Sequence, residues 1–165
     1  PMTSMPDQLP PKLNNTAVLL ALAARCETAS GPDRELDAAI ACTTIPGAEL
    51  ASGDLTEAGE LWVPCDDTRA DSALVGAANY TASIDAALTL VPEGYFVHRI
   101  GQYADMSMWG VIIFRQSDLG LQFPWYGEAT SGARSAGAAA LRARAQYDAA
   151  CATVRELETN RKRNK

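Results

Sequence analysis

Two predicted helices enclose a stretch of strand-forming residues, and this order restricts the fold to a few arrangements. Residues 80–94 begin with Thr81 as a helix cap, continue with apolar side chains at helical spacing, and are ended by a proline. Residues 127–144 open a second helix, capped by Thr130, whose small apolar side chains recur every three or four positions as far as Leu157. Helices on both sides of a group of strands predict an α+β domain.

Three candidate strands lie between these helices. Residues 95–103 alternate in side-chain character, and residues 107–115 are almost continuously apolar, which predicts a central strand covered on both faces. Residues 119–123 form a shorter candidate, and Pro124 places its end at a sheet edge. One face of the central strand should pack beneath the last helix: either Trp109, Val111 and Ile113, or Met108, Ile112 and Phe114.

A helical hairpin is predicted nearer the amino terminus. Asn15 or Thr16 can cap a helix that runs to about residue 28, with apolar side chains at helical spacing. The sequence Ser30-Gly-Pro-Asp33 then ends this helix and starts the next, because glycine suits a helix end and proline suits a first turn.

The remaining segments differ in composition from this core. Residues 1–13 contain four prolines and are expected to be a flexible leader, and residues 159–165 are expected to be a basic tail. Residues 43–79 are rich in glycine, proline and acids, with one strand-like fragment at Leu61-Trp-Val63, and are interpreted as an acidic insertion. We therefore expect a single domain over residues 14–158.

Three of these segments together resemble the phage ABA-sandwich domain, a family of small phage and prophage proteins. They are Ser30-Gly-Pro-Asp-Arg-Glu-Leu-Asp37 and residues 80–94 and 127–144, less than half of the chain. The resemblance implies a three-layer α-β-α sandwich with a small, mainly antiparallel sheet, encoded by a phage or prophage. It implies no activity and no catalytic residues. In similar sequences the last helix often opens with Thr-Pro, whereas Ser131 follows Thr130 here.

The charge is unevenly distributed along the chain. A net charge of −6 and a pI near 4.7 disfavour a nucleic-acid-binding face. Seven of the 20 acidic residues fall within residues 49–71, where Arg69 is the single opposing charge: Glu49, Asp54, Glu57, Glu60, Asp66, Asp67 and Asp71. The stretch is either a solvated loop or a surface for a basic partner, with Trp62 beside it as an aromatic contact.

No recognisable catalytic or metal-binding pattern is present in the sequence. The four cysteines lack the close pairing of a zinc site, and no glycine-rich phosphate loop occurs. His98, the one histidine, lies mid-strand, on the face expected to carry Phe96 and Ile100, which favours a packed or surface residue over a catalytic one. We therefore predict a non-enzymatic protein without a cofactor or metal.

Two features near the last helix could bind a ligand or partner. Trp125 and Tyr126 immediately precede the helix and could form an aromatic recognition patch. Thr130 and Arg134 lie at its start, where free backbone N–H groups make a candidate anion site. Alternatively, the aromatic side chains cover the core and the helix start is satisfied by Thr130 and water.

These observations lead to three hypotheses about function. The first is a phage accessory protein that binds a host protein, for counter-defence or host takeover. The second is a small-ligand protein that binds or sequesters a nucleotide signal, and the third is an enzyme of unrecognised type. We expect a cytoplasmic location in the host cell, without nucleic-acid or membrane binding. Arg25 before Cys26 does not fit a lipoprotein signal, and no apolar run reaches the length of a membrane span.

Overall fold

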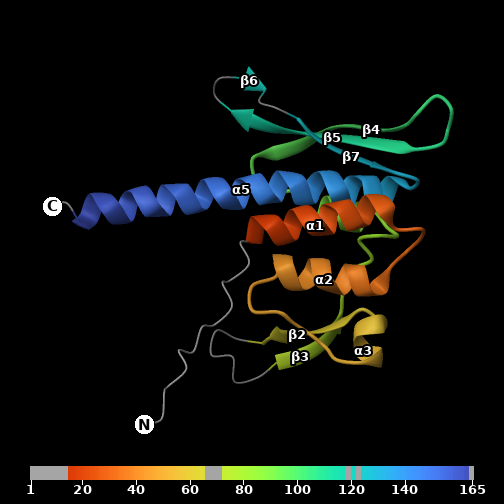
Figure 1. The fold of residues 1–165 in the computed structure, drawn as a ribbon, viewed down its shortest axis with the longest axis horizontal. Coiled ribbons are helices and arrows are strands. Elements are labelled where there is room, and N and C mark those ends of the chain that lie inside the picture. Colours follow the sequence, from red (N-terminus) through yellow and green to blue (C-terminus); the bar gives the residue numbers. More distant parts are fainter. Residues whose placement is uncertain (1–14, 66–71, 118–119, 122–123, 164–165) are drawn as a thin grey trace, which may run out of the picture.

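The computed structural model describes residues 15–65, 72–117, 120–121 and 124–163. Two antiparallel sheets lie on opposite sides of a group of helices (Figure 1). The predicted leader, residues 1–13, falls outside the described residues, as do Asp66, Asp67 and Asp71.

The helical hairpin is formed by α1 (Asn15–Thr28) and α2 (Arg34–Thr44). The predicted apolar stripe of α1 is confirmed, because Leu19, Leu22 and Cys26 are buried. Asp33 caps α2 by accepting a hydrogen bond from the backbone N–H of Leu36 at 2.8 Å. This contact satisfies one of the free N–H groups at the helix start. The helix begins at Arg34, so Pro32 precedes it and does not lie in its first turn as predicted.

A buried polar network joins α2 to the segment that precedes α4 (Ile84–Leu88). The Arg34 guanidinium contacts the fully buried Asp37 carboxylate at 2.8 Å, and that carboxylate accepts from the Thr81 N–H at 2.8 Å. The Thr81 hydroxyl accepts from the Asp33 N–H, so Thr81 is not the helix cap; Ser83 caps α4 instead. The prediction of Thr81 as cap was wrong because this long-range contact occupies its side chain.

The first sheet comes from the stretch predicted to be an acidic insertion. It contains β1 (Glu49–Leu50), β2 (Glu60–Pro64) and β3 (Ser72–Gly76), in the order β1-β2-β3, with α3 (Asp54–Glu57) between β1 and β2. Leu61 on β2 is buried and belongs to the same core cluster as residues of α2. The stretch predicted to be an insertion therefore contributes Leu61 and Ala77 to the hydrophobic core.

The second sheet has β5 (Trp109–Ser117) at its centre, between β4 (Tyr95–Gln102) and β7 (Trp125–Ala129). A short β6 (Gly120–Leu121) pairs with the end of β5. Val111 and Ile113 on β5 are buried, so the first of the two predicted faces packs beneath α5. The opposite face carries Ile112 and Phe114, which are only half-buried, so the prediction of a strand covered on both faces was wrong.

A β-bulge changes the alternation of β4. Val97 pairs with Ile113 and Arg99 pairs with Ile112, so the register shifts at His98. Ile100 consequently packs against the core with Val97, rather than sharing the face of Phe96 as predicted. An extra residue inserted into a strand has this effect, because it reverses the facing of every residue beyond it.

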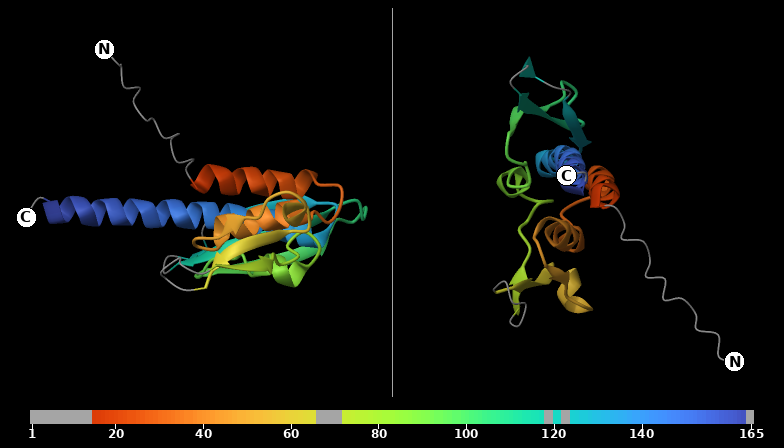
Figure 2. Two further views of the ribbon diagram at one scale, coloured as in Figure 1. Left: turned by 90° about the horizontal axis from the view of Figure 1, so that it is seen from below. Right: turned by 90° about the vertical axis from the view of Figure 1, so that its left-hand side faces the viewer.

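The last helix, α5 (Gly132–Arg163), begins later and ends later than predicted. Residues 127–129 belong to β7, and the side chain of Ser131, not that of Thr130, accepts from the Arg134 N–H at the helix start. The first half of α5 is buried, whereas residues 152–163 are exposed. These exposed residues belong to the second half of the helix, which projects from the body and is called the projecting half of α5 (Figures 1 and 2). Residues 159–163, predicted as a tail, continue the helix.

The α+β class and the antiparallel pairing of the strands are confirmed. The prediction placed one sheet between helical layers, whereas α1, α2 and the first half of α5 lie between two small sheets (Figure 2). The second of these sheets was expected, and the first was not, because its strands are short and surrounded by acidic residues. Within the described ranges, no helix is both long enough and apolar enough for a membrane crossing.

Candidate functional site

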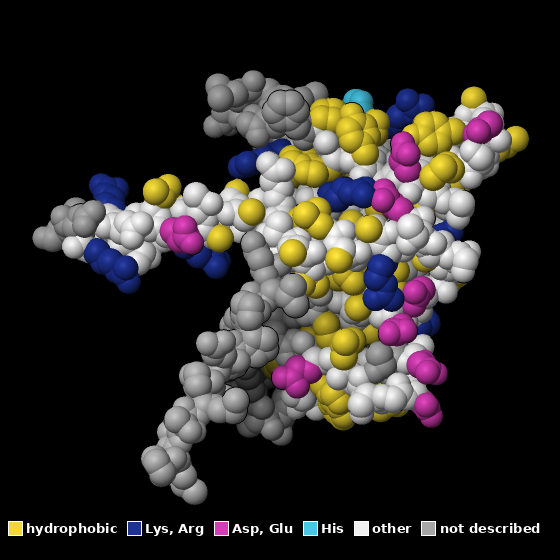
Figure 3. Space-filling model, in the orientation of Figure 1, with side chains coloured by type: hydrophobic (Ala, Val, Ile, Leu, Met, Phe, Trp, Pro, Cys, Tyr) yellow, Lys and Arg dark blue, Asp and Glu magenta, His cyan; other side chains and the backbone are white. Residues whose placement is uncertain are grey.

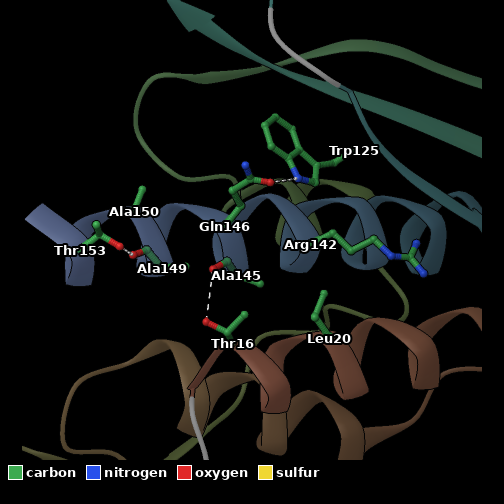
Figure 4. Close-up of a pocket in the computed structure, with 9 residues that line it drawn as sticks. All are labelled: Thr16, Leu20, Trp125, Arg142, Ala145, Gln146, Ala149, Ala150 and Thr153. Atoms are coloured by element: carbon green, nitrogen blue, oxygen red, sulfur yellow. Dashed lines mark hydrogen bonds between the residues drawn. The ribbon is translucent and has the colours of Figure 1, made fainter.

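A groove of about 540 Å³ runs between α1 and the exposed side of α5 (Figure 4). Small side chains of α5 form its floor, Leu20 of α1 forms one wall, and Trp125 of β7 forms the other. Its lining is mostly apolar and consists of Thr16, Leu20, Trp125, Arg142, Ala145, Gln146, Ala149, Ala150 and Thr153. An apolar groove of this kind at the surface of a small domain is a typical contact site for a partner.

Trp125 is held in position by contacts to α5 and β4. Its indole N–H donates to the Gln146 side-chain oxygen at 3.2 Å. Its ring centroid lies 5.0 Å from that of Tyr95, which in turn lies 6.2 Å from that of Tyr147. These tilted and edge-on arrangements are favourable for aromatic rings, so the Trp125 wall is formed before any partner binds.

An ion pair closes the end of the groove nearest the body. The Arg142 guanidinium donates to both oxygens of Glu27, at 2.6 and 2.7 Å, and to the Tyr126 carbonyl at 2.6 Å. Hydrogen bonding by Arg142 lowers the pKa of the Glu27 carboxyl, and the Glu128 N–H adds a further contact to the same carboxylate. The bidentate ion pair with Glu27 and the hydrogen bond to the Tyr126 carbonyl together hold α1, β7 and α5 in place relative to one another.

The apolar surface continues beyond the groove onto the projecting half of α5. Val154 and Leu157 are 55% and 64% exposed and lie one helical turn beyond the lining residues Ala150 and Thr153. The helix then ends in the basic sequence Arg161-Lys-Arg163. Figure 3 shows apolar side chains along this projection, with basic side chains near its end.

The structure separates the aromatic residues that the sequence suggested as one patch. Trp125 and Tyr126 are consecutive on β7, so they point to opposite faces; Trp125 faces α5, and Tyr126 is 52% exposed on the outer face of the second sheet. The groove was missed from the sequence because it combines Trp125 with Leu20, which lies off the buried stripe of α1. An exposed leucine beside an alanine-rich helix was the available signal.

The described acidic candidates lie on the first sheet and on α3, on the far side of the helices from β7 (Figure 1). Trp62 is exposed there, paired across the strands with Glu49 and Leu74, and Glu57 is exposed on α3. Glu60 is half-buried on β2, two residues from Trp62 on the same face. Trp62 is thus brought together with Glu49 and Glu60, but not with Trp125.

A second, smaller depression of about 260 Å³ lies on the outer face of the second sheet. The paired glycines Gly101 and Gly110 leave it without side chains at its floor, and Arg99 and Tyr126 are among its lining residues. The Tyr103 hydroxyl donates to the Glu128 carboxylate at its edge, and this hydrogen bond raises the pKa of Tyr103. Both polar and apolar groups line the depression.

The described residues hold no metal-ligand cluster, and the buried thiol of Cys26 is disfavoured as a nucleophile. No group of three or more His, Cys, Asp or Glu side chains in these ranges could hold a metal ion. His98 is exposed at the bulge, where its ring meets that of Phe114 edge-on at 5.1 Å. Burial raises the pKa of the Cys26 thiol to about 12, which disfavours the reactive thiolate.

Thr130 and Arg134, the candidate anion residues, are brought together at the start of α5. The Arg134 guanidinium folds back along the helix to the Thr130 and Ser131 hydroxyls. Arg134 itself is buried, whereas Thr130 is exposed.

Comparisons of the chain with family models, curated proteins and solved structures found no match.

Proposed function

We propose that the protein acts by binding a partner protein, and that an amphipathic helix of the partner lies in the groove between α1 and α5. The observation that best supports this proposal is the continuity of the groove with the exposed side chains of Val154 and Leu157 on the projecting half of α5. Together they form an apolar track with a preformed aromatic wall, as grooves that bind helices do.

The dimensions of the track favour a helix. Residues 142–157 of α5 span about 23 Å at the usual helical rise, which corresponds to about four turns of a partner helix. The floor residues Ala145 and Ala149 are small, so the backbone of a partner helix can approach closely. A bulkier floor would hold the two helices apart.

The charge at one end of the track indicates the chemistry of the partner. Arg161, Lys162 and Arg163 follow Leu157 by one turn, and none of them forms an ion pair with another described residue. A partner helix with an apolar stripe and acidic residues at the end that reaches this basic sequence would be complementary to it.

The biological setting belongs to the same proposal. The resemblance of residues 30–37, 80–94 and 127–144 to phage ABA-sandwich proteins supports a phage or prophage accessory protein that acts on a host protein. Binding without catalysis fits counter-defence or host takeover in the host cytoplasm. The acidic residues around Trp62 are a separate candidate contact on the opposite sheet.

The test introduces a charged side chain into the groove. Ala149→Arg should block a partner helix without unfolding the domain, because Ala149 is an exposed lining residue. Ala152→Arg is the matched control, since Ala152 is exposed on the same helix but does not line the groove. Tagged wild-type and variant proteins are expressed in the host, retained proteins are identified by mass spectrometry, and the affinity of each purified candidate is measured by titration.

We expect Ala149→Arg to weaken a genuine partner at least tenfold and Ala152→Arg to change its affinity less than twofold. Equal affinity of both variants for every partner would refute the groove as the binding site. A second copy of the protein could also occupy the groove, and analytical ultracentrifugation of the purified protein tests this. If the wild-type protein is a dimer and Ala149→Arg is a monomer, the groove serves self-association, and the proposal of a host helix is overturned.

A second candidate function rests on a different part of the molecule. Capture of a small anionic ligand is supported by the buried guanidinium of Arg134, which has no acidic partner among the described residues.

A further inference from the structure

We infer that the start of α5 is a binding site for a phosphate-type oxyanion, held by Arg134 and the backbone N–H groups of Gly132 and Ala133. This site lies at the buried end of α5, away from the groove and the projecting half of the helix (Figure 1). The inference therefore stands independently of the proposed protein partner.

The first observation is the incomplete pairing of a buried guanidinium. Arg134 is only 4% exposed, and it forms no ion pair within the described part of the chain. Its Nε donates to the Ser131 hydroxyl at 3.0 Å and its Nη2 donates to the Thr130 hydroxyl. Its buried Nη1 has no hydrogen-bond partner among the residues that the structure describes. A buried charge of this kind is strongly destabilising unless an opposite charge compensates it.

The second observation is the state of the helix terminus itself. The Arg134 N–H donates to the Ser131 hydroxyl at 3.4 Å, and the Ser135 N–H donates to the Ser131 carbonyl at 3.1 Å. The N–H groups of Gly132 and Ala133 donate to no described residue, although both residues are buried. Buried helix ends normally have such donors satisfied.

These two observations point to the same kind of ligand. The guanidinium reaches back to the hydroxyls of Thr130 and Ser131, so its free Nη1 and the two free N–H groups belong to one helix start. The positive end of the helix dipole adds to the charge of Arg134, and an arginine in the first turn is unfavourable without a nearby anion. A tetrahedral oxyanion supplies several acceptor oxygens and a negative charge together.

The surroundings limit the size of the ligand and its route of entry. A Cβ atom added at Gly132 would lie 2.9 Å from Ile84 and 3.1 Å from Trp109, so the site is closed on the side of α4 and β5. Thr130 is exposed and Ser131 is half-buried, which leaves the cap residues as the side open to solvent.

The experiment follows the backbone amides at the site by ¹⁵N NMR during titration. Inorganic phosphate, adenosine monophosphate and acetate are each added to the wild-type protein at constant pH and constant ionic strength, with sodium chloride as the balancing salt. We expect the Gly132 and Ala133 amide resonances to shift saturably with phosphate. A matching shift with adenosine monophosphate would identify the phosphomonoester as the source, and its absence would identify the free ion; both support the site.

Two variants separate this site from general charge effects. Arg134→Met retains the aliphatic stem and should raise the dissociation constant for phosphate at least tenfold, whereas Arg155→Met removes an exposed arginine of the same helix and should change it less than twofold. If Arg134→Met does not fold, Thr130→Val provides the second variant. It removes the hydroxyl that accepts from Arg134 Nη2 without removing the charge, and it should weaken phosphate binding severalfold.

Three results would overturn the inference. The first is that the two amide resonances of the wild-type protein show no saturable shift up to tens of millimolar phosphate. The second is that the wild-type protein and Arg134→Met have the same dissociation constant for phosphate. The third is that the wild-type protein binds acetate as tightly as phosphate. The first would mean that ordered water satisfies the helix start. A loss of partner binding in Ala149→Arg would leave all three readouts unaffected, so failure here is distinguishable from failure of the proposed function.

Discussion

Replacing Gly127 by alanine should destabilise the protein more than the same replacement at any other glycine for which the structure describes the surroundings. The added Cβ atom would lie 2.0 Å from the Ser135 carbonyl oxygen and 2.6 Å from the Ala139 nitrogen, both of which are backbone atoms of α5. An ordinary carbon–oxygen contact is about 3.3 Å, so β7 would have to move away from α5 by roughly 1.3 Å.

The magnitude follows from what this movement would disrupt. The overpacking itself costs about 1–3 kcal/mol. The Ser135 hydroxyl donates to the Gly127 carbonyl at 2.6 Å, and leaving these buried groups unpaired costs about 1–3 kcal/mol more. The free energy of unfolding should therefore fall by about 2–6 kcal/mol, which lowers the thermal midpoint by roughly 5–20 °C for a chain of this length.

The assay is urea-induced unfolding followed by circular dichroism, with Gly137→Ala as the matched control. A Cβ atom at Gly137 would meet only the Cys26 sulfur, at 3.5 Å, which is an ordinary contact. Because Gly137 lies inside α5, its replacement should stabilise the protein by about 0.5–1 kcal/mol. If Gly127→Ala unfolds within 1 kcal/mol of the wild type, the close approach of β7 to α5 is refuted.

Three further predictions concern other parts of the molecule. The pKa of Glu27 is lowered by hydrogen bonding from its arginine partner on α5, so the ion pair contributes stability above the usual glutamate value of 4.5 and loses it as the pH falls through the lowered pKa. Glu27→Gln should thus reduce stability at pH 7 and flatten the acid limb of the stability profile; an acid limb unchanged from the wild type would contradict this. Iodoacetamide at pH 8 should modify the exposed Cys65 in the native protein but Cys26, whose pKa is raised by burial to about 12, only after unfolding, as peptide mapping would show. Ile113→Ala should lower the free energy of unfolding by about 2–5 kcal/mol, because Ile113 is fully buried. Ile112→Ala should lower it by about half as much or less, because Ile112 is only half-buried. Equal losses of stability in thermal denaturation would mean that the two faces of β5 are equally covered.

The elements that were predictable from the sequence are those determined by local patterns. The helix boundary at Ser30-Gly-Pro-Asp33 and the apolar stripe of α1 depend on residues within a few positions of one another, and both were found as predicted. The strands β4 and β5 were predicted because alternation and apolar content persist over eight or nine residues. Such signals survive folding because the surrounding structure does not override them.

The elements that were not predictable depend on contacts between distant residues. The fragment around Leu61 becomes a strand because β3 pairs with it, and the five residues of β3 carry too short a pattern to be read alone. The bulge at His98 is visible only through the register with β5. Of the candidate site, Trp125 and Arg134 were named, but the groove required the tertiary placement of Leu20 beside α5.

The two halves of α5 have different sources of helical stability. An isolated helix of about a dozen residues is marginal in water because its first turn is costly to nucleate. Residues 152–163 extend a helix that is already nucleated by the packed segment on β7, so they need only propagate it. Amide hydrogen exchange along α5 should therefore be slow before residue 146 and accelerate progressively toward residue 163. A partner that contacts Leu157 would meet a helix already formed, so association should not wait for a folding step.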